Sequence, residues 1–319
     1  MINIVACASD NYCMQCGVLF YSICLNNYNL DIHFFLITDT NFSNENKEKL
    51  EKTISLFPNK KIDLVYVKDE QIDHVLQFEN PYYTRHVFYR LFMGELLPLN
   101  IEKALYLDCD IIVRHSLSDL WKIDIHDYAI GCVHDAQEGK ISQFNRLGFA
   151  YEKGYFNSGV LLANLVFWRK NNVLNQFVDY IKRESKKIQM PDQDVLNVVL
   201  QDSKLFIPFT YNLQSDFLFK KEHMCYDFIT YGQELQNCWE DPIILHFSGA
   251  RPWIEGCKHP YKDEFFKYKS QTIWKDEALW KNKNKFKEWI IQVSRPPLSK
   301  IGLCSIVPDP FNRNLKLKS

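Results

Sequence analysis

Glycine is scarce in this sequence, and no glycine-rich phosphate-binding loop is present. The chain of 319 residues has only 11 glycines, and neither GxGxxG nor GxxxxGKS/T occurs in it. Such loops bind phosphates through backbone N–H groups at a helix N-terminus. Their absence excludes a Rossmann-type dinucleotide site and a P-loop. If a nucleotide binds here, its phosphates need another source of positive charge, which points to a metal ion.

Strong net charge and long apolar segments are missing as well. The 38 Lys and Arg residues balance 39 Asp and Glu, which leaves a formal charge of −1. A dedicated nucleic-acid-binding protein is strongly basic, so we expect no nucleic-acid partner. The chain has neither a basic-apolar-small signal sequence nor a run of 18 apolar residues. We therefore expect a cytoplasmic protein without a transmembrane helix.

Ten cysteines are present, most of them in apolar stretches where Cys packs as a small hydrophobic residue. Cys13 and Cys16 have the CxxC spacing of redox and zinc pairs, but no second CxxC and no pair of histidines accompanies them. We therefore favour reduced thiols in the cytosol over disulfides or zinc.

The first half of the chain alternates strand-like and helix-like segments. Apolar runs predict buried strands at 2–8, 32–38, 62–67 and 104–107. Helical spacing and helix-start residues predict helices at 12–26, from Ser43 onward, and at 84–97. This order predicts an α/β fold in which helices flank both faces of a mostly parallel sheet. In such sheets, ligands bind at the carboxyl ends of the strands.

The alternation is looser after Asp110. We expect a short strand at 128–133, a polar loop at 139–154, and an apolar segment at 156–165 that runs into a long helix to about Lys187. A further helix opens at Pro191, and a last buried strand covers 243–247. No repeat or low-complexity linker interrupts residues 1–257, so we treat them as one domain.

Two carboxylates follow the fourth predicted strand. In Leu105-Tyr-Leu-Asp108-Cys-Asp110, strand alternation places Cys109 opposite the two aspartates, which converge on one side. Oxygen ligands of this kind suit Mn²⁺ or Mg²⁺, which also bind diphosphate. One alternative is a solvated turn. Another is an aspartyl-phosphate phosphatase, but that class places its DxD near the N-terminus and before Gly-Thr, whereas Ile-Ile follows here.

A second polar block ends the last predicted strand, at Ile244–Trp253. His246 offers a neutral imidazole ligand, Gly249 permits close backbone approach, and Arg251 suits a bidentate phosphate contact. The alternative is a structural histidine. The block Asp192-Gln193-Asp194 carries a similar ambiguity, because carboxylates are also common in the first turn of a helix.

Taken together, six blocks in order resemble glycosyltransferase family 8, over about residues 1–257. The resemblance is strongest to the bacterial lipopolysaccharide galactosyl- and glucosyltransferases. The blocks are Ser9-Asp10-Asn11-Tyr12, Arg90 within 88–91, Tyr106–Asp110, Phe156–Leu165, Asp192-Gln193-Asp194 and His246–Trp253.

The resemblance implies a GT-A type nucleotide-diphospho-sugar transferase fold, a UDP-sugar donor, a Mn²⁺ ion (with Mg²⁺ as the alternative) and retention of anomeric configuration. It implies metal ligation by Asp108, Asp110 and His246. The residues that it places around the donor, Asp108 again among them, are Cys7 (through its backbone), Ser9 or Asp10, Asn11, Tyr12, Arg90, Asp135, Asn157, Gly159, Asp192, Gln193, Gly249 and Arg251. Gln193, Asp192 and Asp135 are the implied catalytic residues.

Two positions depart from the family pattern. The first block reads Ala8-Ser9-Asp10-Asn11 where the family often has an additional Asp, so either Ser9 or Asp10 meets the uracil. Arg251 replaces the usual Lys, which keeps the charge but changes the geometry of a phosphate contact.

Retention of configuration raises a mechanistic question at Gln193. A double displacement needs a nucleophile below the anomeric carbon, and an amide is a poor one. We therefore favour front-face attack through an ion-pair-like state, in which the leaving phosphate takes the acceptor proton.

The last 62 residues differ in charge from the rest. Residues 258–319 carry fourteen Lys and Arg against six Asp and Glu, with Trp274, Trp280 and Trp289 among them. A helical stripe of Leu279, Phe286, Ile290 and Val293 predicts a basic helical C-terminal tail that binds an anionic membrane surface. A helix packed on the catalytic domain is the main alternative, and an RNA-binding tail is less favoured.

These features predict a retaining, metal-dependent hexosyltransferase that moves galactose or glucose from a UDP-sugar to a saccharide or glycolipid acceptor. We expect lipopolysaccharide or another surface glycan as the product, made at the cytoplasmic face of the inner membrane. A catalytically weak sugar-nucleotide-binding protein is the alternative.

Overall fold

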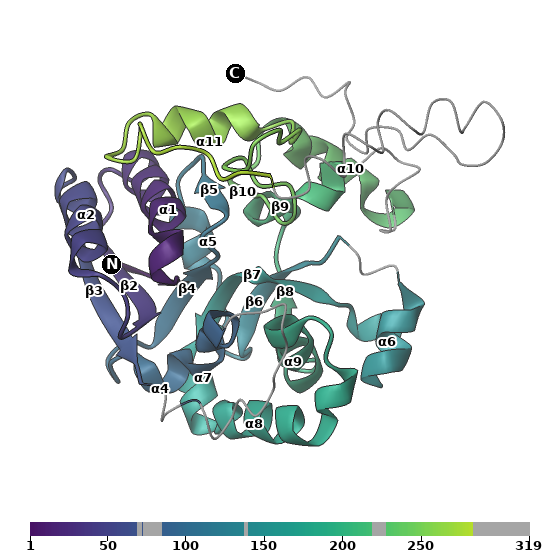
Figure 1. Ribbon diagram of the computed structural model, residues 1–319. Helices are drawn as coiled ribbons and strands as arrows, with labels where there is room; N and C mark the ends of the chain where they lie inside the picture. Colours follow the sequence, from purple (N-terminus) through teal and green to yellow (C-terminus); the bar gives the residue numbers. More distant parts are fainter. Residues whose placement is uncertain (69–71, 73–84, 137–139, 219–227, 283–319) are drawn as a thin grey trace, which may run out of the picture.

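The computed structural model describes residues 1–68, 72, 85–136, 140–218 and 228–282, and its centre is a seven-stranded sheet (Figure 1). The strand order is β3-β2-β1-β4-β7-β6-β8. Their bounds are β1 Ile2–Cys7, β2 Ile32–Asp39, β3 Lys60–Val67, β4 Lys103–Leu107, β6 Ile130–His134, β7 Phe156–Asn164 and β8 Lys204–Phe206. Only β7 runs against its neighbours β4 and β6, and the other pairs are parallel. The predicted mostly parallel sheet is confirmed.

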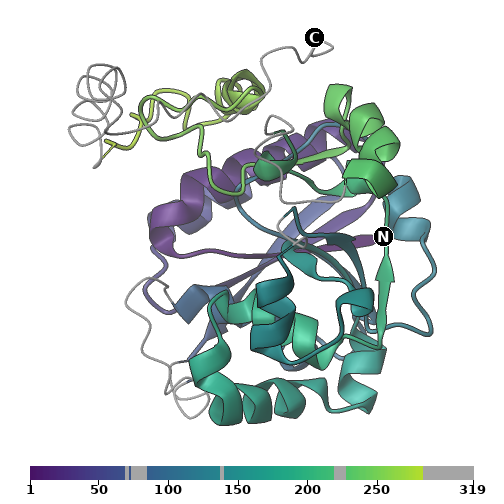
Figure 2. The ribbon, with the colours of Figure 1, turned by 90° about the vertical axis from the view of Figure 1, so that its right-hand side faces the viewer.

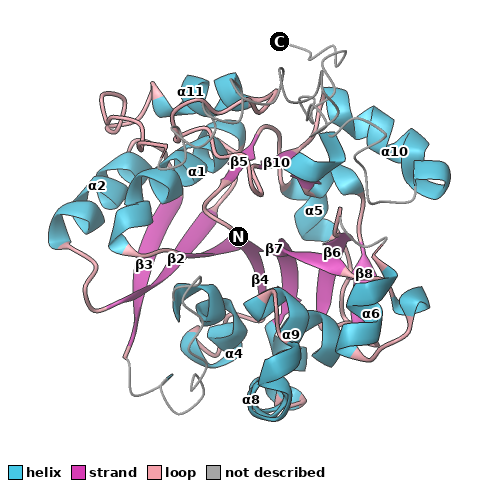
Figure 3. Ribbon diagram, turned by 45° about the vertical axis from the view of Figure 1, so that its right-hand side comes forward, coloured by secondary structure: helices cyan, strands magenta, loops and turns pink. Residues whose placement is uncertain are grey.

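Helices cover both faces of this sheet (Figure 3). Alternate residues of each strand face opposite sides, so Ile4 and Val5 belong to two different apolar clusters. Beside the cluster of Ile4 lie α1 Cys13–Asn26, α2 Asn44–Ser55 and α11 Lys262–Lys269. Beside that of Val5 lie a 3₁₀ helix η2 Arg85–Phe92, α4 Met93–Leu96, α7 Leu165–Lys170, α8 Val173–Glu184 and α9 Pro191–Val199.

A second sheet of three short strands lies beside the first, and of its strands the sequence pattern predicted only β10, as the buried strand at 243–247. β10 Ile244–His246 pairs antiparallel with β5 Ile111–Val113 and parallel with β9 Leu213–Gln214. Around it lie α5 Ser118–Lys122, α10 Phe228–Glu240 and the 3₁₀ turns η5 Phe209–Tyr211 and η6 Ser215–Leu218. Through this small sheet, His246 at the end of β10 lies beside Ile111, the residue that follows Asp110.

Three predicted elements differ in the structure. The helix expected at 84–97 is a 3₁₀ helix followed by α4, and three-residue turns place Phe88 and Leu91 on one buried face. The long helix expected up to Lys187 breaks at Asn172, whose φ of 51° is left-handed. The loop expected at 139–154 contains α6 Ile141–Leu147 and the turn η3 Tyr151–Lys153.

The segment after residue 257 packs on residues 1–257 as far as the structure describes it. Figure 2 shows α11 above α1, and Tyr261, Phe265, Tyr268 and Trp274 are buried in the same cluster as Ile4. Trp280 forms a bridge to Ile254. These aromatic side chains are therefore core rather than membrane-facing. Of the predicted stripe, Phe286, Ile290 and Val293 lie outside the described residues, as does Trp289. Within the described ranges, every helix is too short or too polar to span a bilayer.

Candidate active site

The direction of β7 brings distant parts of the chain to one edge of the central sheet. β1 and β4 are parallel, so their carboxyl ends, at Cys7 and Leu107, lie at the same edge. β7 is antiparallel to β4, so its first residues lie at that edge too, and Asp108 donates its backbone N–H to the carbonyl of Gly159. This is the edge at which ligands bind in open α/β sheets.

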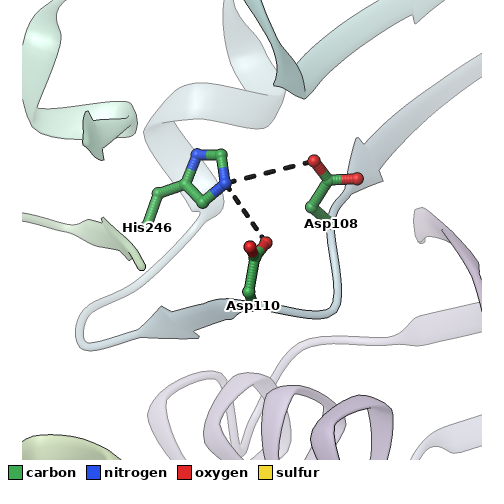
Figure 4. Close-up of side chains that lie close together, drawn as sticks. All are labelled: Asp108, Asp110 and His246. Atoms are coloured by element: carbon green, nitrogen blue, oxygen red, sulfur yellow. Dashed lines mark ion pairs between the residues drawn. The ribbon is translucent and has the colours of Figure 1, made fainter. Parts of the chain in front are cut away.

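Asp108, Asp110 and His246 converge at this edge (Figure 4). The Nε2 of His246 lies 3.2 Å from Oδ1 of Asp110 and 4.0 Å from Oδ2 of Asp108. One ligand atom from each residue falls within 4.8 Å of the other two. Two carboxylates and an imidazole are a donor set that suits Mn²⁺ and related divalent ions.

Gly159 leaves the space in which these side chains meet. A Cβ at this position would lie 2.4 Å from Cε1 of His246 and 2.9 Å from Oδ2 of Asp108. Any other residue would therefore displace the imidazole or the carboxylate. In the block Phe156-Asn157-Ser158-Gly159, Asn157 and Ser158 supply polar side chains, and Gly159 leaves room for the side chains of Asp108 and His246.

The ionisation of Asp110 and His246 is mutually reinforcing. Burial opposes charge on both, but the adjacent imidazole, with Arg251 beyond it, holds the pKa of Asp110 below its usual range. The pKa of His246 is likewise raised against burial by the charge and hydrogen bond of Asp110. A cation placed between the two carboxylates would stabilise their negative charge, as the imidazole of His246 does for Asp110 here.

Arg90 links the candidate metal-ligand group, formed by Asp108, Asp110 and His246, to Asp192 on the opposite side of the site. Its guanidinium is buried and bonded to Oδ1 of Asp108 at 2.8 Å and to Oδ2 of Asp192 at 3.1 Å. It also lies over the ring of Tyr106, whose hydroxyl donates to Oδ1 of Asp108 at 2.7 Å. Oδ1 of Asp108 is therefore held by two donors, and Oδ2 is directed to His246. Burial raises the pKa of Asp192, although the charge of Arg90 opposes the shift.

The amide of Gln193 is held at both ends by hydrogen bonds. Its Oε1 accepts from the backbone N–H of Ser158 at 3.0 Å and from Nδ2 of Asn157 at 3.3 Å. Its Nε2 donates to Oδ2 of Asp135 at 3.1 Å, and that oxygen also accepts from Asn157 at 3.2 Å. Four buried side chains, Asp135 just after β6, Asn157 of β7, and Asp192 and Gln193 of α9, line one cavity of about 740 Å³.

A second, smaller cavity of about 340 Å³ continues from the first. The two share Arg90, Asp108, Asp110 and Arg251, and the smaller one is closed by Cys7, Ser9, Tyr12 and His86. Arg251 donates to the hydroxyl of Tyr12, whose pKa is raised by burial. Burial also raises the pKa of Cys7 well above its ordinary range, so Cys7 offers its backbone rather than a thiolate. Gly249 lines the larger cavity with a φ of 117°, a conformation that favours glycine.

Asp10 and Asn11 line neither of these two cavities, although the resemblance places both around the donor. Oδ1 of Asp10 accepts from the N–H and the hydroxyl of Ser43 and from Nδ2 of Asn46, each at 2.8 Å. Asp10 is therefore committed to the start of α2. Of the pair left open by the sequence, Ser9 is the one that lines the cavity, while Asp10 and Asn11 border a separate hollow toward Trp280.

Sequence reasoning missed several polar residues of the site. Tyr106 holds Asp108, Ser158 holds Gln193, His86 closes the smaller cavity beside Asp39 at 2.9 Å, and Asn212 contacts His246. Tyr106 and Ser158 stood inside recognised blocks, where a polar residue in an apolar strand was the available signal. Asn212 and His86 lie outside any such block, and no local pattern marks them.

The family model "Glycosyl transferase family 8" matches residues 3–257, and the chain belongs to that family. It is 29% identical to General stress protein A of Bacillus subtilis, over 86% of this chain and 95% of that protein. It is 25% identical to a lipopolysaccharide 1,2-glucosyltransferase of Escherichia coli, over 87% of this chain and 80% of that protein.

A solved structure of a glycosyltransferase has a similar fold. The solved structure of the galactosyltransferase LgtC, in complex with donor and acceptor sugar analogues, superposes with a TM-score of 0.75 at 23% identity. The match covers 86% of this chain and 99% of that one. The expected family and the expected GT-A fold are thus confirmed, and nothing in this fold supports the aspartyl-phosphate phosphatase alternative.

Proposed function

We propose that this protein is a retaining glycosyltransferase that moves galactose or glucose from a UDP-sugar to a saccharide acceptor and requires Mn²⁺ or Mg²⁺. The observation that carries the proposal is the convergence of Asp108, Asp110 and His246 beside Gly159, at the junction of two connected cavities. The smaller cavity has the dimensions and aromatic wall for a nucleoside, and the larger one has buried polar groups for a hexose.

The residues present fit a divalent cation. Asp108, Asp110 and His246 would hold it, and Gly159 keeps the space clear of a side chain. When bound, such an ion neutralises charge that develops on a diphosphate leaving group. Arg251, at the cavities' shared wall, adds a second positive charge toward that diphosphate.

The remaining side chains bind and orient the sugar. Asp135 and Asp192 are buried carboxylates with acceptor capacity for hydroxyl groups, and Arg90 fixes Asp192 in place. Oε1 of Gln193 already accepts from Ser158 and Asn157, which makes it a still poorer nucleophile. The proposal therefore retains front-face attack, in which the bond from the anomeric carbon to the phosphate oxygen breaks as the acceptor oxygen approaches from the same face. The acceptor proton passes to the departing phosphate oxygen.

The names of several relatives support a surface glycan as the product. Two are called lipopolysaccharide 1,2-glucosyltransferase and lipopolysaccharide 1,3-galactosyltransferase. We propose an acceptor of this class, used at the cytoplasmic face of the inner membrane, with residues 283–319 as the membrane-binding part. Cosedimentation with anionic vesicles tests this: full-length protein should sediment and a chain ending at Asn282 should not. Equal sedimentation of the two would contradict it.

A donor screen tests the activity. Purified protein, Mn²⁺ and a panel of UDP-sugars are combined, and release of UDP is measured with and without EDTA. One UDP-hexose should be hydrolysed slowly or transferred, and both EDTA and Asp110→Asn should abolish the reaction. If no UDP-sugar yields UDP but Mn²⁺-dependent binding persists, the protein is a sugar-nucleotide-binding protein instead.

A further inference from the structure

Asn212 has a fully buried amide that contacts His246 on the side of the ring facing away from Asp108 and Asp110. It follows η5 and directly precedes β9, and its side chain has no exposed surface. Its Oδ1 lies 2.9 Å from Nδ1 of His246, the ring nitrogen that faces away from the two aspartates. Its Nδ2 donates to Oδ1 of Asn157 at 3.0 Å. The residue therefore joins His246 to the group that holds Gln193.

The orientation of every amide in this group is determined by backbone donors. The N–H of Gly159 donates to Oδ1 of Asn157 at 3.0 Å, so that atom is an oxygen and the atom of Asn212 facing it is a nitrogen. The other end of the Asn212 amide, which faces His246, is then an oxygen. The N–H of Ser158 assigns Gln193 in the same way, and Nδ2 of Asn157 donates to both Asp135 and Gln193 in agreement.

We infer that Asn212 is a positioning residue that places the proton of His246 on Nδ1 and directs the Nε2 lone pair to the metal-ligand group. An amide oxygen can only accept, so Nδ1 of His246 must donate to it. Nε2 is then the ligand atom, on the side of Asp108 and Asp110. The partner of the second ring nitrogen commonly sets the tautomer of a metal-binding histidine. The inference deepens the proposed function, on which it rests for the presence of a metal.

The second consequence is coupling between the two ends of the site. Asn157 accepts from Asn212 and donates to Asp135 and Gln193, so one amide carries contacts from the metal side and from the sugar side. A change at Asn212 therefore reaches the sugar-binding residues through Asn157, although Asn212 itself lines neither cavity.

Two measurements on the full chain test the assignment. Without an ion, Nε2 of His246 donates to Asp110, 3.2 Å away, so the tautomer is measured in protein saturated with diamagnetic Mg²⁺ and labelled with ¹⁵N-histidine, where NMR should show the Nδ1–H form. Titration with Mn²⁺, followed by the electron paramagnetic resonance of the free ion, gives its Kd. Asn212→Leu should lose the tautomer preference and raise the Kd about 10- to 100-fold. Asn212→Asp keeps an acceptor for Nδ1–H but loses the donor to Asn157, so it should retain the tautomer.

Asn27→Leu is the matched control. Asn27 is 3% exposed, and its amide bonds Ile23 and Leu117 rather than any residue of the site. This variant should leave tautomer and Kd unchanged. An Nε2–H tautomer in the wild type overturns the inference, even if Asn212→Leu does not fold. So does a folded Asn212→Leu with the wild-type tautomer and Kd. If the wild type binds neither Mn²⁺ nor Mg²⁺, the proposed metal dependence fails and the inference fails with it, whereas metal binding with an Nε2–H tautomer overturns the positioning role alone.

Discussion

Trp274 occupies the space that a side chain on Gly17 would need. A Cβ at Gly17 would lie 2.1 Å from Cη2 and Cζ3 of the indole, which is itself buried. Gly17 lies in the middle of α1, where glycine is unfavourable by about 1 kcal/mol relative to Ala. The contact explains why a helix interior holds a glycine, and it fastens the segment after α11 to residues 1–257.

Gly17→Ala is therefore expected to destabilise the protein despite its better helix propensity. Overpacking a rigid ring costs about 1–3 kcal/mol. Urea unfolding should show this loss, and combining Gly17→Ala with Trp274→Ala should cost less than the sum of the two single changes. Strict additivity would show that the ring does not meet the new methyl group.

Gly159→Ala should remove metal binding without unfolding the protein. Its Cβ would fall 2.4 Å from His246 and force the imidazole from its place. We expect the Mn²⁺ Kd to rise more than tenfold, measured by calorimetry. Gly131→Ala is the control in a neighbouring strand, because its Cβ would meet nothing nearer than Ile207 at 3.4 Å. If Gly159→Ala binds Mn²⁺ as the wild type does, the site is not where we place it.

We expect Asp10 to be a structural residue and Ser9 to be a ligand-binding one. Asp10→Ala removes three hydrogen bonds at the start of α2 and should lower the free energy of unfolding by about 1–2 kcal/mol. Its Kd for UDP should stay unchanged. Ser9→Ala should show the reverse, with normal stability and UDP binding weakened about fivefold. Weaker UDP binding by Asp10→Ala than by Ser9→Ala would reverse the assignment.

His259 should make the protein sensitive to mild acid. The ring is 1% exposed, and burial lowers its pKa from 6.5 to about 3. In the unfolded chain it takes up a proton below about pH 6.5, while the folded protein resists, so stability falls as pH decreases from 6.5 toward 3. The slope is about 1.4 kcal/mol per pH unit from this residue.

His259→Asn keeps an acceptor for the N–H of Tyr261, which bonds Nδ1 at 3.1 Å, but cannot be protonated. Unfolding free energies of this variant between pH 7 and 5 should fall less steeply than those of the wild type, by one proton. His126→Asn, at an exposed histidine, is the control. An unchanged slope in His259→Asn would assign the acid sensitivity to other groups.

The sequence predicted β1 to β4 and β6 of the central sheet because these strands carry a period of two or a continuous apolar run, whereas β7 was expected only as an apolar segment and β8 was not predicted. Ile2–Cys7 and Ile32–Asp39 matched to within a residue. Of the three-stranded sheet, only β10 was predicted, as the strand at 243–247, because β5 and β9 have three and two residues and are too short for any period to register. The pairing of β10 with β5 also joins residues that lie more than 100 positions apart, such as Ile111 and His246.

The candidate site divides in a similar way. Asp108, Asp110, His246 and Gln193 were found because each stands in a block with a recognisable order. Asp10 was assigned to the donor by its neighbours in sequence, yet the helix start at Ser43, 33 positions away, holds it. Asn212 could not be found, because its role depends on Asn157 and His246, at separations of 55 and 34 residues. Local pattern identifies groups that touch a ligand better than groups that orient them.

The pairing of β10 with β5 has a consequence for the timing of synthesis. His246, the third proposed metal ligand, follows Asp108 and Asp110 by more than 130 residues, and its pairing with Ile111 brings it back to them. At roughly 5–20 residues per second, the ribosome exposes the two carboxylates for about 7–27 seconds before the imidazole is even made. The nascent chain therefore holds an unfinished chelator, and a metal ion can stabilise the completed domain but cannot guide the folding of its first half.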